Sequence, residues 1–218
     1  MNDADKRKII DRYNQRFAEF GADIRTLASG TEERRQLRFG VLAEIGLTPG
    51  CSVLDLGCGF GDFYGHLSRR GLDCEYTGYD INPTLIEAAR CKFPDGRFEV
   101  KDIQAEPFPA FDFVVSSSAF NLPVSDGDNY AFITDILTRC FQHARLGVAV
   151  DFLTSYVDFQ SPEAFHYSPE RTFAIGKSIT KRVSLRHDYP LYEFCLYLYP
   201  DFEGWHGKQS GNPGVHHV

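Results

Sequence analysis

The sequence predicts an α/β fold in which helices cover both faces of a mainly parallel β-sheet. Short apolar runs alternate with amphipathic helical segments for about 120 residues from Ser52 onward, and this alternation is typical of parallel sheets. Gly, Pro, Asn and Asp separate the segments, as expected for turns. The chain has 218 residues, of which 43% are hydrophobic, so it suits one globular domain with a short helical addition.

The first part of the chain is expected to form two helices. Apolar residues recur at three- and four-residue steps over residues 9–20 and 31–45, and a glycine follows each segment. Because these helices precede the first strand, we predict that residues 1–46 form a helical lid. The main domain then spans residues 47–203, and residues 204–218 are expected to form a flexible tail.

The main domain alternates predicted strands with predicted helices. The strands are expected at residues 52–56, 75–80, 98–102, 111–115, 147–153, 179–186 and 192–199. The helices are expected at residues 63–70, 84–92, 129–143 and 169–176. Asn82 and Pro83 supply an N-cap and a first-turn proline for the second of these helices, and a turn is expected at residues 126–128. Ligands of such sheets bind beyond the carboxyl ends of the strands, so we expect the functional residues there.

Charge and composition exclude several classes of protein. The chain carries 23 Lys and Arg against 30 Asp and Glu, a net charge of −7, without a basic stripe, so we expect no nucleic-acid partner. No apolar run approaches the roughly 18–20 residues of a membrane helix. No apolar segment of a signal peptide follows the charged N-terminus. We therefore expect a cytoplasmic protein without a membrane partner.

The six cysteines lack the spacing of a metal site or a disulfide framework. No C-x-x-C pair occurs, and no histidine lies close to a cysteine in a zinc-like pattern. We expect free thiols in a reducing compartment and no metal site. His216 and His217 could bind a metal ion, but they lie in the predicted tail.

The first predicted strand ends in the glycine-rich segment Gly57-Cys58-Gly59-Phe60-Gly61. Alternate glycines allow a sharp turn into a helix and a close approach of the backbone to a ligand. Asp80 ends the next strand, where a carboxylate can accept hydrogen bonds from ribose hydroxyls. The dinucleotide fingerprint G-x-G-x-x-G fails here, and Asp62 stands where a pyrophosphate would need backbone donors. The pattern therefore favours a nucleoside cofactor without phosphates.

Four segments of the chain resemble the motifs of the class I S-adenosylmethionine-dependent methyltransferases. Residues 55–61 (DLGCGFG) resemble motif I, and residues 79–82, 100–103 and 111–116 resemble the second, third and fourth motifs in the same order. The resemblance implies a Rossmann-like three-layer sandwich, with a mostly parallel seven-stranded sheet and a final antiparallel strand. It also implies S-adenosyl-L-methionine as the cofactor.

The resemblance further implies roles for individual residues. The three loop glycines would bring the backbone to the methionine part and the ribose, Asp80 would hold the ribose hydroxyls, and Asp102 would accept a hydrogen bond from the adenine amino group. Ser117 would offer its carbonyl to the ammonium group. The cofactor-binding residues that it implies are Asp55, Gly57, Gly59, Gly61, Asp80, Ile81, Asp102, Ile103 and Ser117. The alternative is that Asp80 and Asp102 are helix caps or solvated loop acids.

Arg38 is a further candidate for cofactor binding, on the second predicted helix just before the main domain. The planar fork of an arginine matches a carboxylate, so the Arg38 guanidinium could pair with the carboxylate of the cofactor. An exposed arginine on an amphipathic helix is the alternative.

The acceptor pocket is expected to form from the lid and from the segments after the fourth and fifth strands. Aromatic side chains are dense there, which suits a small aromatic or heterocyclic molecule. The predicted substrate-binding residues are Phe120, Asn121, Tyr156 and Tyr167. His166 and Tyr13 are the candidate catalytic bases, His166 because histidine titrates near neutral pH. Each of these side chains could instead serve in packing or at the surface.

We therefore predict a methyltransferase that acts on N or O of a small molecule, as a monomer or a homodimer. Enzymes of the family that methylate amino groups of nucleic acids carry an Asn/Asp-Pro-Pro-aromatic motif after the fourth strand, where this chain has SSAFN at residues 117–121. Two alternatives stay open. One is a nicotinamide-linked oxidoreductase, which the failed fingerprint disfavours, and the other is a non-catalytic protein that retains a cofactor-binding site.

Overall fold

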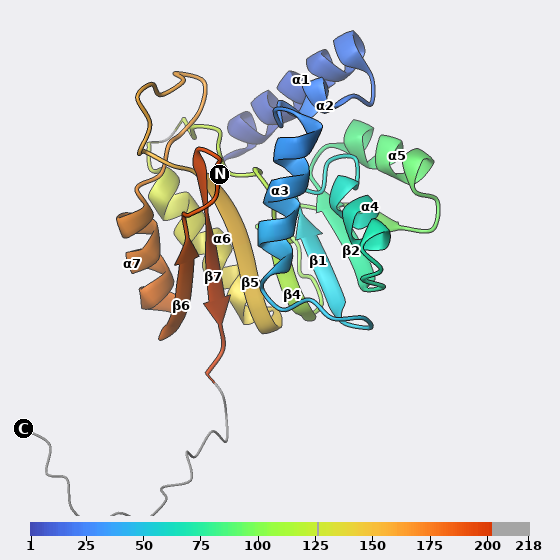
Figure 1. The fold of residues 1–218 in the computed structure, drawn as a ribbon. Helices are drawn as coiled ribbons and strands as arrows, with labels where there is room; N and C mark the ends of the chain where they lie inside the picture. Colours follow the sequence, from blue (N-terminus) through green and yellow to red (C-terminus); the bar gives the residue numbers. More distant parts are fainter. Residues whose placement is uncertain (126, 202–218) are drawn as a thin grey trace, which may run out of the picture.

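The strands form one seven-stranded sheet in the order β3-β2-β1-β4-β5-β7-β6 (Figure 1). The structure, a computed structural model, describes residues 1–125 and 127–201. The strands are β1 (Ser52–Leu56), β2 (Glu75–Asp80), β3 (Arg97–Val100), β4 (Phe111–Ser116), β5 (Ala144–Leu153), β6 (Arg182–Arg186) and β7 (Glu193–Tyr199). β1 to β5 are parallel, and β7 runs antiparallel between β5 and β6. The predicted fold class, including the antiparallel strand, is confirmed.

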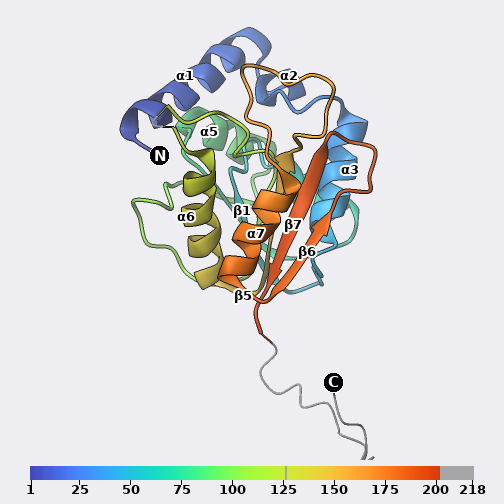
Figure 2. The ribbon, with the colours of Figure 1, turned by 90° about the vertical axis from the view of Figure 1, so that its left-hand side faces the viewer.

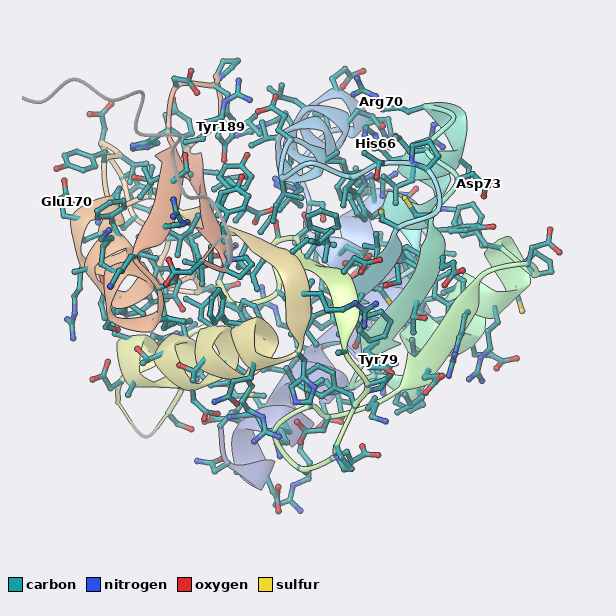
Figure 3. The ribbon with its side chains drawn as sticks, turned by 90° about the horizontal axis from the view of Figure 1, so that it is seen from below. His66, Arg70, Asp73, Tyr79, Glu170 and Tyr189 are labelled. Atoms are coloured by element: carbon teal, nitrogen blue, oxygen red, sulfur yellow. The ribbon has the colours of Figure 1, made fainter. Side chains whose placement is uncertain are left out.

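Helices cover both faces of the sheet (Figures 1 and 2). They are α1 (Asp3–Phe20), α2 (Ile24–Leu27), α3 (Glu32–Ala43), α4 (Asp62–Arg69), α5 (Pro83–Lys92), α6 (Asn129–Gln142) and α7 (Pro169–Ile179). Because successive strand residues face opposite sides, Val53 packs in the cluster that α3, α4 and α5 cover, and Leu54 packs in the cluster beneath α6. Figure 3 shows side chains filling both sides of the sheet.

Some element boundaries differ from the sequence predictions. The four-residue helix α2 was not predicted, because it is too short to show a helical period. β5 begins at Ala144 rather than at residue 147, since the pairing with β4 already starts there. α7 continues to Ile179, so β6 begins later than predicted, at Arg182. The predicted tail and residue 126 of the predicted turn lie outside the described residues.

α1 lies across the carboxyl ends of the parallel strands (Figures 1 and 2). The Asn82 side-chain amide, after β2, donates to the Ile10 carbonyl at 3.3 Å. The Ser125 amide, after β4, donates to the Asp5 carboxylate at 3.1 Å. These contacts hold α1 where the loops of the sheet converge. Within the part of the chain that the structure describes, no helix is both long and apolar enough to span a membrane.

Candidate active site

A cavity lies at the carboxyl ends of the parallel strands, where the strand order reverses between β1 and β4. The predicted site residues that line it are Tyr13, Arg38, Asp55, Gly57, Gly59, Asp80, Ile81, Asp102, Ile103, Ser117 and Phe120. They come from α1, from α3 and from the ends of four strands, so the fold brings together residues that are far apart in the sequence. Among residues 1–125 and 127–201, no group of three or more His, Cys, Asp or Glu side chains is placed to hold a metal ion.

The glycine loop after β1 lies against two other parts of the cavity wall. Gly57 has a φ of 74°, and a Cβ built on it would lie 2.5 Å from the Cβ of Ala119 in the turn after β4. Gly59 has a φ of 53°, and a Cβ there would lie 3.2 Å from the side chain of Leu27. A side chain at either position would therefore strain the backbone, and it would also collide with Ala119 or crowd Leu27. Gly61 is the N-cap residue of α4 and is not part of the lining.

Two carboxylates flank the glycine loop. Asp80 ends β2, and its two oxygens accept hydrogen bonds from the amides of Gly59 at 3.0 Å and Asn82 at 2.9 Å. Asp55, which is 3% exposed, accepts a hydrogen bond from the Tyr76 hydroxyl at 2.6 Å. Burial raises the pKa of both carboxyl groups, to about 7 for Asp55. A carboxylate has about four acceptor sites, so Asp80 can still accept from a ligand in the cavity.

Asp102 lies after β3 at the other end of the cavity, beside α1. The Lys6 ammonium of α1 lies 2.5 Å from one carboxylate oxygen, and the Gln104 amide donates to the other at 2.9 Å. Burial opposes ionisation of Asp102, but the Lys6 ammonium, the Gln104 amide and the N-terminal ammonium together outweigh it and hold the pKa of this carboxyl group below its usual value. Ile81 and Ile103, which follow the two acids Asp80 and Asp102 in the chain, also line the cavity.

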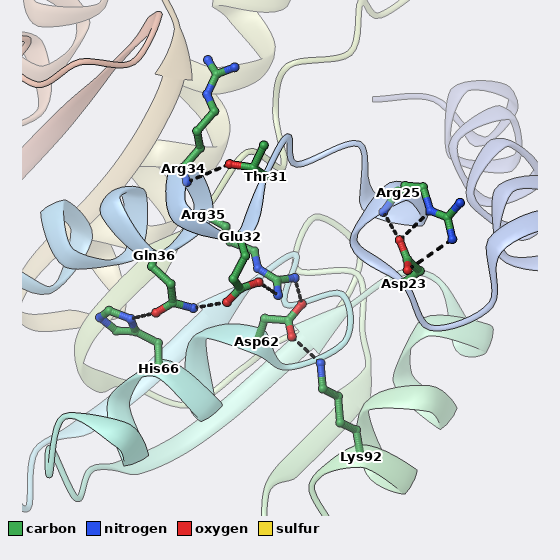
Figure 4. A network of polar contacts seen from close by, with 10 residues as sticks. All are labelled: Asp23, Arg25, Thr31, Glu32, Arg34, Arg35, Gln36, Asp62, His66 and Lys92. Atoms are coloured by element: carbon green, nitrogen blue, oxygen red, sulfur yellow. Dashed lines mark hydrogen bonds and ion pairs between the residues drawn. The ribbon is translucent and has the colours of Figure 1, made fainter.

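Two arginines of α3 reach the cavity. Arg38 is 5% exposed, and its guanidinium donates to both oxygens of the Glu193 carboxylate, at 2.6 and 2.5 Å. Arg35 pairs with Asp62 at 2.5 Å, and Asp62 also pairs with Lys92 (Figure 4). The Nε of Arg35 is buried without a hydrogen-bond partner among the described residues. The sequence analysis missed Arg35, although its position three residues before Arg38 places both on one helix face.

The structure brings two of the predicted acceptor residues, Tyr13 and Phe120, to the cavity. Tyr13 comes from α1 and Phe120 from the loop after β4. Burial is the largest cause of a raised pKa for the Tyr13 hydroxyl, and the charge of Asp80 adds to it. Tyr13 therefore stays protonated and can act as a hydrogen-bond donor to a ligand.

The other four predicted acceptor residues lie outside the cavity lining, where local contacts hold them. The Nδ1 of His166 lies 2.9 Å from the Thr154 carbonyl oxygen. Asn121 accepts from a backbone amide of β5 at 3.0 Å. Tyr167 is fully buried, and its hydroxyl donates to the backbone of the loop after β4 at 2.9 Å. Tyr156 is 63% exposed and donates to a glutamate of α7. The aromatic side chains of this segment therefore serve to pack α6, α7 and the loops against one another.

Comparison with known proteins agrees with this geometry. A family model described as a methyltransferase domain matches residues 53–141. A Mycobacterium tuberculosis protein that is named as a methyltransferase is 34% identical over 151 residues, which cover 66% of this chain and 90% of the relative. The chain belongs to the class I S-adenosylmethionine-dependent methyltransferases. The family and the enzyme class that the four motifs implied are therefore confirmed.

More distant relatives of this methyltransferase agree on the fold. Trans-aconitate 2-methyltransferase of an Enterobacter species is 32% identical over 108 residues, and the match spans less than half of that relative, 41%. A TehB-like methyltransferase from Corynebacterium glutamicum has a TM-score of 0.58 at 18% identity, covering 92% of this chain and all of that one. An O-methyltransferase family protein from Burkholderia thailandensis has a TM-score of 0.64 at 16% identity, covering 86% of this chain and 62% of that one.

Proposed function

We propose that this methyltransferase transfers the methyl group of S-adenosyl-L-methionine to N or O of a small molecule that binds under α1. The observation that carries the proposal is the single cavity in which the glycine loop, Asp80, Asp102 and Ser117 meet. A nucleoside needs acceptors for its hydroxyl and amino groups, and a sulfonium amino acid needs no phosphate-binding donors. Both requirements match the residues that line this cavity.

The residues fit the cofactor in the following way. Asp80 would accept from the ribose hydroxyls, since its oxygens have acceptor capacity left. Ile81 and Ile103 would cover the adenine, and Asp102 would accept from the adenine amino group. Ser117 would face the ammonium group. The remaining candidates for the amino-acid end are Gly57, Gly59 and Asp55, whereas Gly61 caps α4 outside the lining and the Arg38 guanidinium is bound by Glu193.

The chain's own contribution to methyl transfer is alignment and exclusion of water. When bound, the cofactor would supply an electrophilic methyl group, which an N or O atom of the acceptor attacks in line with the methyl–sulfur bond while S-adenosylhomocysteine leaves. The cavity wall holds the acceptor beside that group, and α1 shields both from solvent. Tyr13 and Phe120 are the candidates for contact with the acceptor, and Tyr13 would donate a hydrogen bond that orients it. His166 would need to reach the cavity to serve as a base, so its role is the weaker proposal.

The first test is binding of the cofactor and its demethylated product, measured by calorimetry. We expect Asp80→Asn to raise the Kd for S-adenosylhomocysteine roughly 10- to 100-fold, because a charged acceptor of ribose hydroxyls becomes a neutral amide. Asp73→Asn is the matched control, since Asp73 is exposed and precedes the opposite end of β2. Wild-type affinity in Asp80→Asn would remove Asp80 from the site.

The second test separates this function from its alternatives. Transfer of labelled methyl groups from S-adenosyl-L-methionine to a panel of small amines, phenols and carboxylic acids should yield at least one methylated product. Saturable binding of NADH without binding of S-adenosylhomocysteine would favour an oxidoreductase instead. Tight binding of S-adenosylhomocysteine with no turnover across the panel would indicate a non-catalytic protein.

A further inference from the structure

The turn that follows β4 contains a backbone conformation that needs support. Ser118 has a φ of 56°, in the left-handed region, and only one other non-glycine residue of the described chain, Ala28, has a positive φ. This conformation is unfavourable for a non-glycine residue, because it brings the Cβ too close to the following carbonyl oxygen. Its neighbours Ser117 and Ala119 line the cavity with it. The turn therefore forms part of the cofactor site while storing local strain.

A single buried carboxylate holds Ser118 in this conformation. The Oδ1 of Asp151 accepts hydrogen bonds from the Ser118 amide at 2.7 Å and from the Ser118 hydroxyl at 3.3 Å. Asp151 is 1% exposed and lies on β5, where its neighbour Val150 pairs with Ser116 of β4. The strand register thus places the Asp151 side chain beside the turn. The two hydrogen bonds offset the cost of the strained backbone.

The Asp151 carboxylate is in turn held by a buried ion pair. Its second oxygen, Oδ2, has no hydrogen-bond partner among the described residues and lies 4.0 Å from the Nε of Arg38. Arg38 is fixed by its two hydrogen bonds to Glu193 of β7. Burial raises the pKa of the Asp151 carboxyl group to about 7, and the Arg38 guanidinium opposes this rise because it favours the charged form.

We propose that Asp151 is a positioning residue for the cofactor, acting through the turn at residues 117–119. By fixing Ser118, it holds Ser117 at the place where the amino-acid end of the cofactor would bind. It also holds Ala119 against Gly57, where the contact leaves no room for a Cβ. The inference rests on the proposed function, because it concerns how the wall of the cofactor site keeps its shape.

Asp151→Asn tests this role with almost no change in shape. An asparagine side chain has one oxygen and one NH2 group. If the NH2 group faces the Arg38 guanidinium, the attraction to Arg38 is lost, and if it faces the Ser118 amide, the hydrogen bond from that amide is lost. We expect the Kd for S-adenosylhomocysteine to rise at least 10-fold, and KM for the cofactor to rise more than kcat falls. Asp112→Asn is the matched control, because Asp112 also accepts from a serine amide and hydroxyl, those of Ser52, at the amino ends of β1 and β4.

Ser118→Gly distinguishes positioning from a general effect on stability. Glycine adopts positive φ without cost, so adding Ser118→Gly to Asp151→Asn should restore most of the lost affinity, whereas a merely structural loss would not be restored. If Asp151→Asn fails to fold, Ser118→Val provides the test, since a β-branched residue resists this conformation while Asp151 stays intact. We expect Ser118→Val to weaken cofactor binding at least 10-fold.

Two results would overturn the inference while leaving the proposed function standing. One is wild-type cofactor affinity in Asp151→Asn or in Ser118→Val, and the other is an equal loss of affinity in Asp151→Asn with and without Ser118→Gly. Failure of the wild-type protein to bind either S-adenosyl-L-methionine or S-adenosylhomocysteine would instead contradict the proposed function.

Discussion

Aspartates in one cavity serve different purposes because their partners differ. Asp80 accepts from two backbone amides, Asp102 pairs with a lysine, and Asp55 accepts from a tyrosine hydroxyl. The two backbone donors leave acceptor sites of the Asp80 carboxylate free for a ligand, whereas the Lys6 ammonium uses some of the acceptor sites of Asp102. The sequence predicted where Asp80 and Asp102 lie, since Asp80 ends one β-strand and Asp102 follows the next. It could not predict Lys6 as a partner, because that contact depends on how α1 packs.

His66 is expected to make folding stability depend on pH. It is 3% exposed on α4, its Nδ1 lies 2.6 Å from the Gln36 side-chain oxygen (Figure 4), and its Nε2 is buried without a hydrogen-bond partner among the described residues. Burial, together with the charges of the nearby Arg70 and Arg69, lowers the pKa of His66 to about 4. The folded state therefore disfavours the charged form that the unfolded chain adopts below its ordinary pKa of about 6.5.

The sign of this effect follows from proton binding. Between pH 6.5 and about 4 the unfolded state binds the proton more strongly, so the stability present at pH 7 is lost as the pH falls through this window. We expect a loss on the order of 2 kcal/mol from this group. Urea denaturation of His66→Gln at pH 7 and pH 4.5 should show a smaller loss than the wild type. His187→Gln, at an exposed position, should match the wild type.

Among the elements, α1 is the clearest case of a helix that the sequence predicts without predicting its position. Its apolar spacing predicted a helix, and the structure has one from Asp3 to Phe20. Its place over the sheet follows instead from polar contacts to loops after β2, β3 and β4, at Asn82, Asp102 and Ser125. These partners lie far along the chain and have no sequence pattern of their own. The same holds for α2, whose Leu27 packs against Gly59.

Lys6→Gln is predicted to loosen α1 without unfolding the domain. The substitution removes the ion pair with Asp102, in which the two side chains are only about one-fifth exposed, 20% and 22%. A loss of about 1 kcal/mol corresponds to roughly five-fold faster hydrogen exchange in α1. Hydrogen exchange by mass spectrometry checks this, with Lys8→Gln as the control on an exposed position of the same helix. Equal exchange of α1 in both variants would show that the ion pair does not hold the helix.

At the scale of the whole molecule, a buried ion pair joins α3, which precedes the sheet, to β7, the last strand of the described chain. The parallel part of the sheet follows from alternating strands and helices, so the sequence alone predicted it. Arg38 of α3 and Glu193 of β7 are 155 residues apart, and their pairing could not be predicted because it depends on how α3 packs against the sheet. From the sequence, Arg38 was a candidate for the cofactor carboxylate, with an exposed arginine as the alternative. The structure shows it buried instead, with its guanidinium bound to the carboxylate of Glu193.

This ion pair predicts strong non-additivity between the two residues. Arg38→Met leaves the Glu193 carboxylate buried without its cation, and Glu193→Met leaves Arg38 with Asp151 alone, so each should cost about 3–5 kcal/mol of folding free energy. The double variant removes both charges and should cost at least about 2 kcal/mol less than the sum of the single variants, measured by urea denaturation. The matched control is the more exposed pair Arg186 and Glu44, which joins the C-cap of α3 to β6 and should couple by at most about 1 kcal/mol. Additive losses of folding free energy at Arg38 and Glu193 would mean that their contact does not stabilise the packing of α3 against β7.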